Sequence, residues 1–137
     1  MPQGITADII QAANVAKTRA IAPYSNFRVG AAIQTEDGKI YSGCNIEASS
    51  YSLTLCAERV ALFKALSEGE KRLKSIAIVT DTALFCPPCG ACRQVLMDFA
   101  PRLRVILVNS TGESKSFQLN ELLPEAFTEA FLERGRD

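Results

Sequence analysis

Three cysteines with the spacing of metal ligands occur at two places in the chain. Cys56 stands alone, and Cys89 and Cys92 follow within the segment Cys86–Arg93. Gly90 and the prolines before Cys89 predict a tight turn that leads into a helix, so that these thiols lie at a helix N-terminus. At that position the helix dipole and the unpaired backbone N–H groups favour negative charge. They lower the pKa of a thiol and produce the thiolate, which is the form that binds metal.

Cys56, Cys89 and Cys92 are predicted to hold one zinc ion. Cys89 and Cys92 are three residues apart, so they share one face of the predicted helix. Three protein ligands leave a fourth position for water, which is typical of a catalytic zinc site, and zinc lowers the pKa of that water toward ~7. Glu58 is predicted to move the proton, and Arg59 to donate hydrogen bonds to the thiolates.

The same cysteines also allow other interpretations. A structural four-cysteine zinc site would take Cys44 or Cys86 as its fourth ligand. A redox pair would be formed by Cys86 and Cys89, or by Cys89 and Cys92. The two prolines after Cys86 make it hard for Cys86, Cys89 and Cys92 to share one ion. We therefore expect Cys44 and Cys86 to be buried or half-buried thiols without a ligand role.

The chain of 137 residues contains no histidine. This absence excludes Ser–His–Asp and Cys–His catalysis, as well as every zinc site that needs an imidazole. Any metal has to be held by Cys, Asp or Glu, and a general base has to be a carboxylate, Lys, Tyr or a thiolate. Glu58 is the carboxylate nearest in sequence to a predicted ligand, which strengthens its assignment.

The composition narrows the class of protein. With 47% hydrophobic residues, the chain is predicted to be a single globular domain over residues 1–137. Lys plus Arg and Asp plus Glu are both 15, and this zero net charge argues against a nucleic-acid partner or a membrane surface. No apolar run is long enough to span a membrane. The N-terminus lacks the form of a signal peptide, so the five cysteines are expected to be cytoplasmic thiols.

The hydrophobic periodicity predicts helices and strands in alternation. In the first half of the chain we expect a helix capped by Thr6 that ends by Pro23, a strand over 27–34, a turn at Asp37–Gly38, a strand from Ile40 and a helix over 56–69. In the second half we expect a buried strand over 76–79, a helix over 91–100, a buried strand over 105–108, an edge strand over 116–118 and a helix over 121–132 broken at Pro124. This order predicts a three-layer α/β/α sandwich with a mixed five-stranded sheet. Both cysteine groups then meet at one end of the sheet.

The cysteine segments resemble a known family of enzymes. The zinc deaminases have a ligand-x-Glu segment followed by Pro-Cys-x-x-Cys, which here is Cys56-Ala57-Glu58 and Pro88–Cys92. The resemblance extends to the small three-cysteine cytidine deaminases and covers nearly the whole chain. Its segments are 23–32, 43–47, 56–59, 88–94 and 122–127.

The resemblance implies roles for residues around the metal. Cys56, Cys89 and Cys92 would bind one zinc ion per chain. Glu58 would take the proton from water and deliver protons to N3 of the pyrimidine and to the departing amine. The backbone N–H of Ala57 would bind O2 of the base, and the carbonyl of Pro87 would face the leaving ammonia. Pro87 departs from the small polar residue that is usual in the family, and Cys86 is an unusual additional thiol that could inactivate the enzyme by pairing with Cys89.

Four further residues are assigned by the resemblance to the nucleoside. Asn45 and Glu47 would hydrogen-bond the ribose hydroxyls, although polar residues of this kind are ordinary in loops. Phe27 would line the base pocket, or would simply belong to the core. The family is homotetrameric, and Phe127 would reach into the site of a neighbouring subunit, unless it packs against its own chain.

The predicted function is hydrolytic deamination of cytidine and 2′-deoxycytidine to the uridine forms and ammonia, within pyrimidine salvage. One alternative is a blasticidin-type deaminase that acts on a modified cytosine nucleoside. A deaminase of nucleic acids would need a basic and aromatic surface, and the zero net charge argues against it. A zinc-stapled interaction domain without enzymatic activity is the remaining alternative, and it would not need Glu58.

Overall fold

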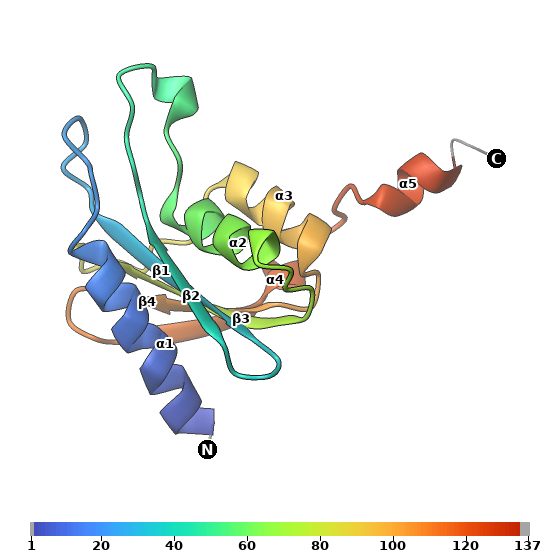
Figure 1. The fold of residues 1–137 in the computed structure, drawn as a ribbon, viewed down its shortest axis with the longest axis horizontal. Coiled ribbons are helices and arrows are strands. Elements are labelled where there is room, and N and C mark those ends of the chain that lie inside the picture. Colours follow the sequence, from blue (N-terminus) through green and yellow to red (C-terminus); the bar gives the residue numbers. More distant parts are fainter. Residues whose placement is uncertain (1, 135–137) are drawn as a thin grey trace.

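A computed structural model describes residues 2–134, in which a five-stranded sheet is covered by helices on both faces (Figure 1). The strands lie in the order β2-β1-β3-β4-β5. Their bounds are Val29–Thr35 for β1, Ile40–Cys44 for β2, Leu73–Thr80 for β3, Arg104–Val108 for β4 and Ser114–Gln118 for β5. Strands β3 and β4 run parallel, whereas the other three neighbouring pairs are antiparallel. The predicted mixed sheet is therefore confirmed.

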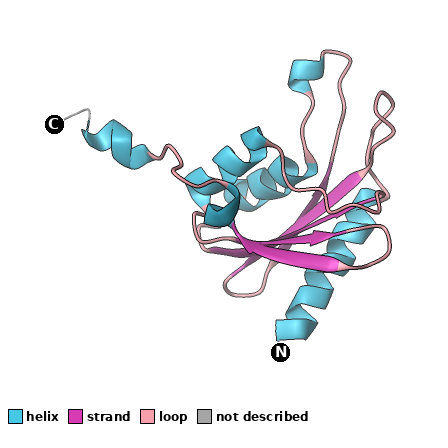
Figure 2. Cartoon of the chain, turned by 180° about the vertical axis from the view of Figure 1, so that it is seen from behind, coloured by secondary structure: helices cyan, strands magenta, loops and turns pink. Residues whose placement is uncertain are grey.

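Helix α1 (Pro2–Lys17) covers one face of the sheet, and helices α2 (Ala57–Ser67) and α3 (Gly90–Phe99) cover the other (Figures 1 and 2). The alternation of β1 divides its side chains between the two layers. Ala32 packs in the core beneath α1, and Ala31 and Ile33 pack in the core beneath α2 and α3. Because both faces of the strand are covered, both sets are buried.

Two glycines allow the helices to lie unusually close to the strands. A Cβ atom added to Gly30 in β1 would lie 2.0 Å from the carbonyl oxygen of Ala13 in α1. A Cβ atom added to Gly43 in β2 would lie 2.6 Å from the backbone nitrogen of Ala61 in α2. Only a residue without a side chain fits at either position. Close contact with β2 thus fixes the helix that follows Cys56.

The ends of the chain differ from the predictions. Helix α1 begins at Pro2, which suits the first helical position, so the prediction that Thr6 caps this helix is wrong. The helix also ends at Lys17, well before Pro23. Near the other end, the predicted helix over 121–132 is replaced by two short helices, α4 (Leu119–Leu122) and α5 (Glu129–Arg134).

The break between α4 and α5 has a local cause. Pro124 has no N–H group to donate within a helix, and Glu125 adopts a positive φ of 54°. The chain therefore leaves the body of the molecule after α4. Helix α5 stands apart from the sheet and from the other helices in both views (Figures 1 and 2).

Candidate active site

The three predicted ligand thiols meet at the N-terminal ends of two helices. Cys56 directly precedes α2, Cys89 directly precedes α3, and Cys92 lies in the first turn of α3. Their sulfur atoms all lie within 4.8 Å of one another. Cys89 and Cys92 are separated by 3.3 Å, and Cys56 and Cys89 by 3.9 Å. Within residues 2–134, this group has the arrangement of a metal site, and neither Cys44 nor Cys86 belongs to it.

Hydrogen bonds distribute the charge of the thiol cluster unevenly. A hydrogen bond with Cys92 lowers the pKa of Cys56 to about 5, and Arg59 contributes in the same direction. The same bond, together with burial, raises the pKa of Cys92. The guanidinium group of Arg59 therefore favours the thiolate form of Cys56. Arg59 donates from Nη2 to the sulfur of Cys56 at 3.6 Å and to the carbonyl of Thr54 at 3.4 Å.

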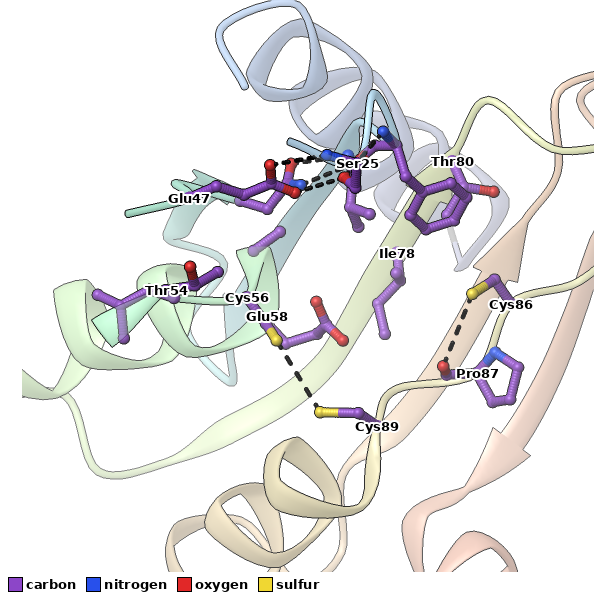
Figure 3. A pocket seen from close by; sticks show the side chains of 15 residues that line it. Ser25, Glu47, Thr54, Cys56, Glu58, Ile78, Thr80, Cys86, Pro87 and Cys89 are labelled. Atoms are coloured by element: carbon purple, nitrogen blue, oxygen red, sulfur yellow. Dashed lines mark hydrogen bonds between the residues drawn. The ribbon is translucent and has the colours of Figure 1, made fainter. Parts of the chain in front are cut away.

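Glu58 lies beside the thiol cluster, because it occupies the first turn of α2. Its side chain is only 5% exposed, and burial raises its pKa to about 7. Figure 3 shows its carboxyl group directed into a pocket, close to Cys56 and Cys89. A carboxyl group with a pKa near neutrality can both accept and donate a proton at physiological pH. This is the property required of a proton carrier.

The pocket that contains these groups has a volume of about 260 Å³. Its walls come from β1, β3, the loop before α2 and the segment Cys86–Cys89. Figure 3 shows Cys56, Cys89 and Glu58 toward one end of the pocket and Glu47 toward the other, and Asn45 also lines the pocket. Phe27 and Pro87 also line it, as does buried Ala57. A volume of this size suits a small molecule rather than a polymer.

Asn45 and Glu47 already have partners in the protein. The side-chain oxygen of Asn45 accepts a hydrogen bond from the backbone N–H of Val29 at 2.9 Å, and its Nδ2 donates to the carbonyl of Phe27 at 2.8 Å. Glu47 accepts from the backbone N–H groups of Tyr24 and Ser25 at 3.0 and 3.1 Å. The hydroxyl of Ser25 donates to it as well and holds the pKa of Glu47 below its ordinary value. Both side chains thus order the segment that carries Phe27.

The structure does not place Phe127 in the pocket of its own chain. Its side chain is 56% exposed and stacks on Phe131, with 5.5 Å between the ring centroids. The backbone carbonyl of Phe127 accepts a hydrogen bond from Gln94 of α3 at 2.8 Å. The segment is thereby tied to the helix that carries Cys92, while its aromatic rings remain open to solvent.

The three hydroxyl-bearing residues that line the pocket, Ser25, Thr54 and Thr80, were not among the predicted site residues. Thr80 could have been predicted from the sequence. It lies two residues after Ile78, at the end of a predicted buried strand, and residues two apart in a strand share a face. Ser25 and Thr54 stand in loops, where neither periodicity nor spacing indicates the direction of a side chain.

The fold and the three-thiol site define a zinc-binding deaminase domain. Residues 5–108 match the family model described as the cytidine and deoxycytidylate deaminase zinc-binding region, and the chain belongs to this family. The curated cytidine deaminase of Halalkalibacterium halodurans is 50% identical over 121 residues, which are 88% of this chain and 92% of that protein. The crystal structure of cytidine deaminase from Burkholderia pseudomallei superimposes with a TM-score of 0.85 at 48% identity, covering 88% of this chain and 98% of that one.

A second kind of relative is more distant. The blasticidin-S deaminase of Bacillus cereus is 35% identical over 108 residues, which are 73% of this chain and 76% of that protein. Within the described residues, no helix has the length and hydropathy needed to cross a membrane. The donor set also suits the metal named in the family description, since three cysteine sulfurs are soft ligands that zinc accepts in tetrahedral sites.

Proposed function

We propose that this protein deaminates cytidine and 2′-deoxycytidine by hydrolysis. In this reaction an oxygen from water forms a bond to C4 of the pyrimidine, the C4–N4 bond breaks, and ammonia leaves. The observation that carries the proposal is the buried carboxyl group of Glu58, which points into the pocket beside three thiols. Family membership and the 50% identical relative named cytidine deaminase support the same substrate.

The thiols of Cys56, Cys89 and Cys92 are the proposed ligands of one zinc ion. When bound, zinc supplies a Lewis acid that makes water acidic enough to react near neutral pH. Glu58 accepts the proton of that water and passes protons to N3 and to the departing amine, since its buried carboxyl group points into the pocket beside the thiols. Arg59, bonded to Cys56 at 3.6 Å, offsets the negative charge of the thiolates.

The remaining pocket residues are proposed to hold the nucleoside. The backbone N–H of Ala57 binds O2 of the base, and the carbonyl of Pro87 faces the leaving ammonia. Asn45 and Glu47 hydrogen-bond the ribose, and Phe27 contacts the base. All five residues line the same pocket, which supports their assignment as a group.

The alternatives are less well supported. A blasticidin-type activity rests on a relative at 35% identity, compared with 50% for a cytidine deaminase. A purely structural zinc module would need neither a pocket nor a buried carboxyl group next to its thiols. A nucleic-acid deaminase would need a basic surface, whereas the net charge is zero.

We further propose that the active form is a homotetramer with shared sites. Phe127 and Phe131 are both more than half exposed, as are Tyr51 and Leu53 on the loop that projects before α2 (Figure 1). Apolar side chains gathered on projecting segments favour contact with another subunit. In such an assembly, Phe127 covers the base in a neighbouring site.

The setting of the enzyme is also part of the proposal. We place it in the cytoplasm, because all five cysteines, each within the described residues, are unpaired thiols. Residues 1–137 are proposed to form one domain, since the strands of the described part belong to a single sheet. The reaction returns cytosine nucleosides to the uridine pool, which assigns the enzyme to pyrimidine salvage.

The decisive experiment follows the ultraviolet absorbance of cytidine in the presence of the zinc-loaded protein. Cytidine should be converted to uridine with release of ammonia, while an oligonucleotide rich in cytosine should remain unchanged. Glu58→Gln is the matched control, because it keeps the size of the side chain and removes its charge. A protein that retains zinc and leaves cytidine unchanged would overturn the proposed activity.

A further inference from the structure

The chemistry of the proposed reaction fixes how a pyrimidine lies in the pocket. C4 has to meet the thiol cluster, where the C–N bond breaks. N3, on one side of C4, has to reach Glu58 to receive a proton. The other neighbour of C4 is C5, which must then face away from Glu58. Figure 3 shows Glu58 and Cys86 on opposite sides of the pocket with Ile78 between them, so C5 faces the wall that contains Cys86.

Cys86 lines this wall without belonging to the thiol cluster. Its side chain is half-buried, and its sulfur lies 3.9 Å from the carbonyl oxygen of Pro87, the next residue. Burial raises the pKa of this thiol, so it presents a neutral and polarisable group to the pocket. A neutral sulfur at this wall limits the space beside the base and adds no charge.

Thr80 lines the same pocket from the end of β3 and is only 2% exposed. Its hydroxyl oxygen has no hydrogen-bond partner among the described residues. Buried polar groups in proteins are rarely left unpaired, so this hydroxyl group is available to a ligand or a water molecule that enters the pocket. Figure 3 shows Thr80 and Cys86 beyond Ile78 as seen from Glu58, on the side that C5 would face.

We propose that Cys86 and Thr80 form a subsite for the substituent at C5 of the pyrimidine. This inference rests on the proposed cytidine deaminase function and specifies which cytidines the site accepts. The pocket measures only about 260 Å³, so one additional carbon beside the base has a large effect. Cys86 limits the size of the substituent, and the hydroxyl of Thr80 favours a substituent that can form a hydrogen bond.

The test compares kcat/KM for 5-methylcytidine with kcat/KM for cytidine in the zinc-loaded enzyme. One carbon in a tight apolar pocket changes this ratio by about 10- to 200-fold. Cys86→Leu should lower the ratio within that range, because its branched side chain occupies the subsite. Cys86→Ala should raise it by about tenfold, at the lower end of the same range. Cys44→Ala, which removes a half-buried thiol outside the pocket, should leave the ratio unchanged.

A second measurement isolates Thr80. The variant Thr80→Val keeps the shape of the side chain and removes its hydroxyl. The preference of the enzyme for 5-hydroxymethylcytidine over 5-methylcytidine should fall by about 2- to 12-fold, the value of one hydrogen bond. An unchanged preference in a folded, zinc-containing variant would exclude Thr80 from the subsite.

The outcomes separate this inference from the function on which it rests. If cytidine is deaminated and both Cys86 variants keep the wild-type ratio, the C5 subsite is wrong and the proposed activity stands. If the zinc-loaded wild type leaves cytidine unchanged, both the C5 subsite and the proposed deaminase activity are wrong. Zinc content and circular dichroism report whether each variant is folded. If Cys86→Leu does not fold, the smaller Cys86→Ala decides the result.

Discussion

The two ends of the pocket are built on different principles. At the thiol end, Cys56, Cys89 and Cys92 contact one another at helix N-termini, and their function depends on residue type and spacing. At the end that is proposed to bind the nucleoside, called the nucleoside end below, Asn45 and Glu47 accept hydrogen bonds from backbone N–H groups of neighbouring segments. A substitution at the first end therefore removes chemistry from an intact scaffold. A substitution at the second end is expected to disturb the proposed nucleoside binding and the local structure together.

The largest effect is expected from the thiols. Cys56→Ala, Cys89→Ala or Cys92→Ala should lose the zinc ion and all measurable deamination, because two sulfur ligands do not complete the site. Metal analysis of the purified variants, compared with about one zinc per chain in the wild type, is the measurement. Cys44→Ala should keep its metal. Loss of zinc from Cys86→Ala would show that the ligand set has been assigned wrongly.

Glu58→Gln tests whether proton transfer at the thiol end can be removed without removing the zinc ion. The variant should keep its fold and its zinc and lose about 10²–10⁴ in kcat, the usual contribution of acid–base catalysis. Steady-state kinetics and metal analysis of the same sample give both readings. Activity within tenfold of the wild type contradicts the proton-carrier role, and loss of zinc would make Glu58 a ligand.

This contrast explains what was predictable from the sequence. The thiol cluster followed from cysteine spacing and helix-start signals, both of which are local. The mixed sheet followed from the apolar runs over 76–79 and 105–108, each buried on two faces. The hydrogen bonds of Asn45 to Val29 and Phe27 could not be predicted, because they join residues 16 and 18 positions apart. Loop side chains acquire a direction only when the whole fold is present.

The chain termini show a different limit. The prediction of a cap at Thr6 relied on residue preference, yet the helix starts at Pro2 and runs through that position. Residue preference is a weak signal when tertiary packing favours a longer helix. The helix break at Pro124 was predictable from the missing N–H group of proline, but the residue at which the next helix, α5, begins was not.

Glu47→Ala probes the nucleoside end. A site that hydrogen-bonds ribose should reject free cytosine, because free cytosine has no ribose to form those additional hydrogen bonds. Loss of one charged partner should reduce the preference for cytidine over cytosine by about 12- to 160-fold in kcat/KM. Assays of both substrates with the wild type and the variant provide the ratio. Equal turnover of the two substrates by the wild type would indicate a deaminase of free bases.

Phe127→Ala asks whether the nucleoside end is completed by another subunit. Stacking of an aromatic ring on a base contributes about 1–3 kcal/mol, so kcat/KM should fall by roughly 5- to 150-fold with zinc unchanged. Phe131→Ala is the matched control, since that ring stacks on Phe127 and is similarly exposed. It should have the smaller effect.

Subunit mixing then tests whether Phe127, the proposed lid over the base, covers the site of a neighbouring subunit or the site of its own chain. Glu58→Ala chains are combined with Phe127→Ala chains under conditions that exchange subunits. If the lid comes from a neighbour, some sites pair an intact Glu58 with an intact Phe127, and activity rises above that of either parent. Activity equal to the weighted average of the parents, after exchange has been demonstrated, rules out shared sites.

The smallest effect is expected on stability. Asn45→Ala should lower the free energy of unfolding by about 1–3 kcal/mol, because the N–H of Val29 and the carbonyl of Phe27 lose their partner. Glu58→Gln should leave the unfolding free energy much less affected. Denaturant titrations of both variants measure the difference, and equal losses would remove the distinction between the two ends.

Gly30 and Gly43 are expected to constrain how the sequences of such enzymes diverge. Neither residue lines the pocket, yet the close approach of α1 and α2 leaves no room for a side chain at either position. Selection acting on relatives with other substrates should therefore preserve these glycines as strictly as the cysteines. The invariant positions of this lineage should therefore include the glycines that allow close helix–strand packing as well as the cysteines of the thiol cluster. Position 86, by contrast, should drift as substrate choice changes.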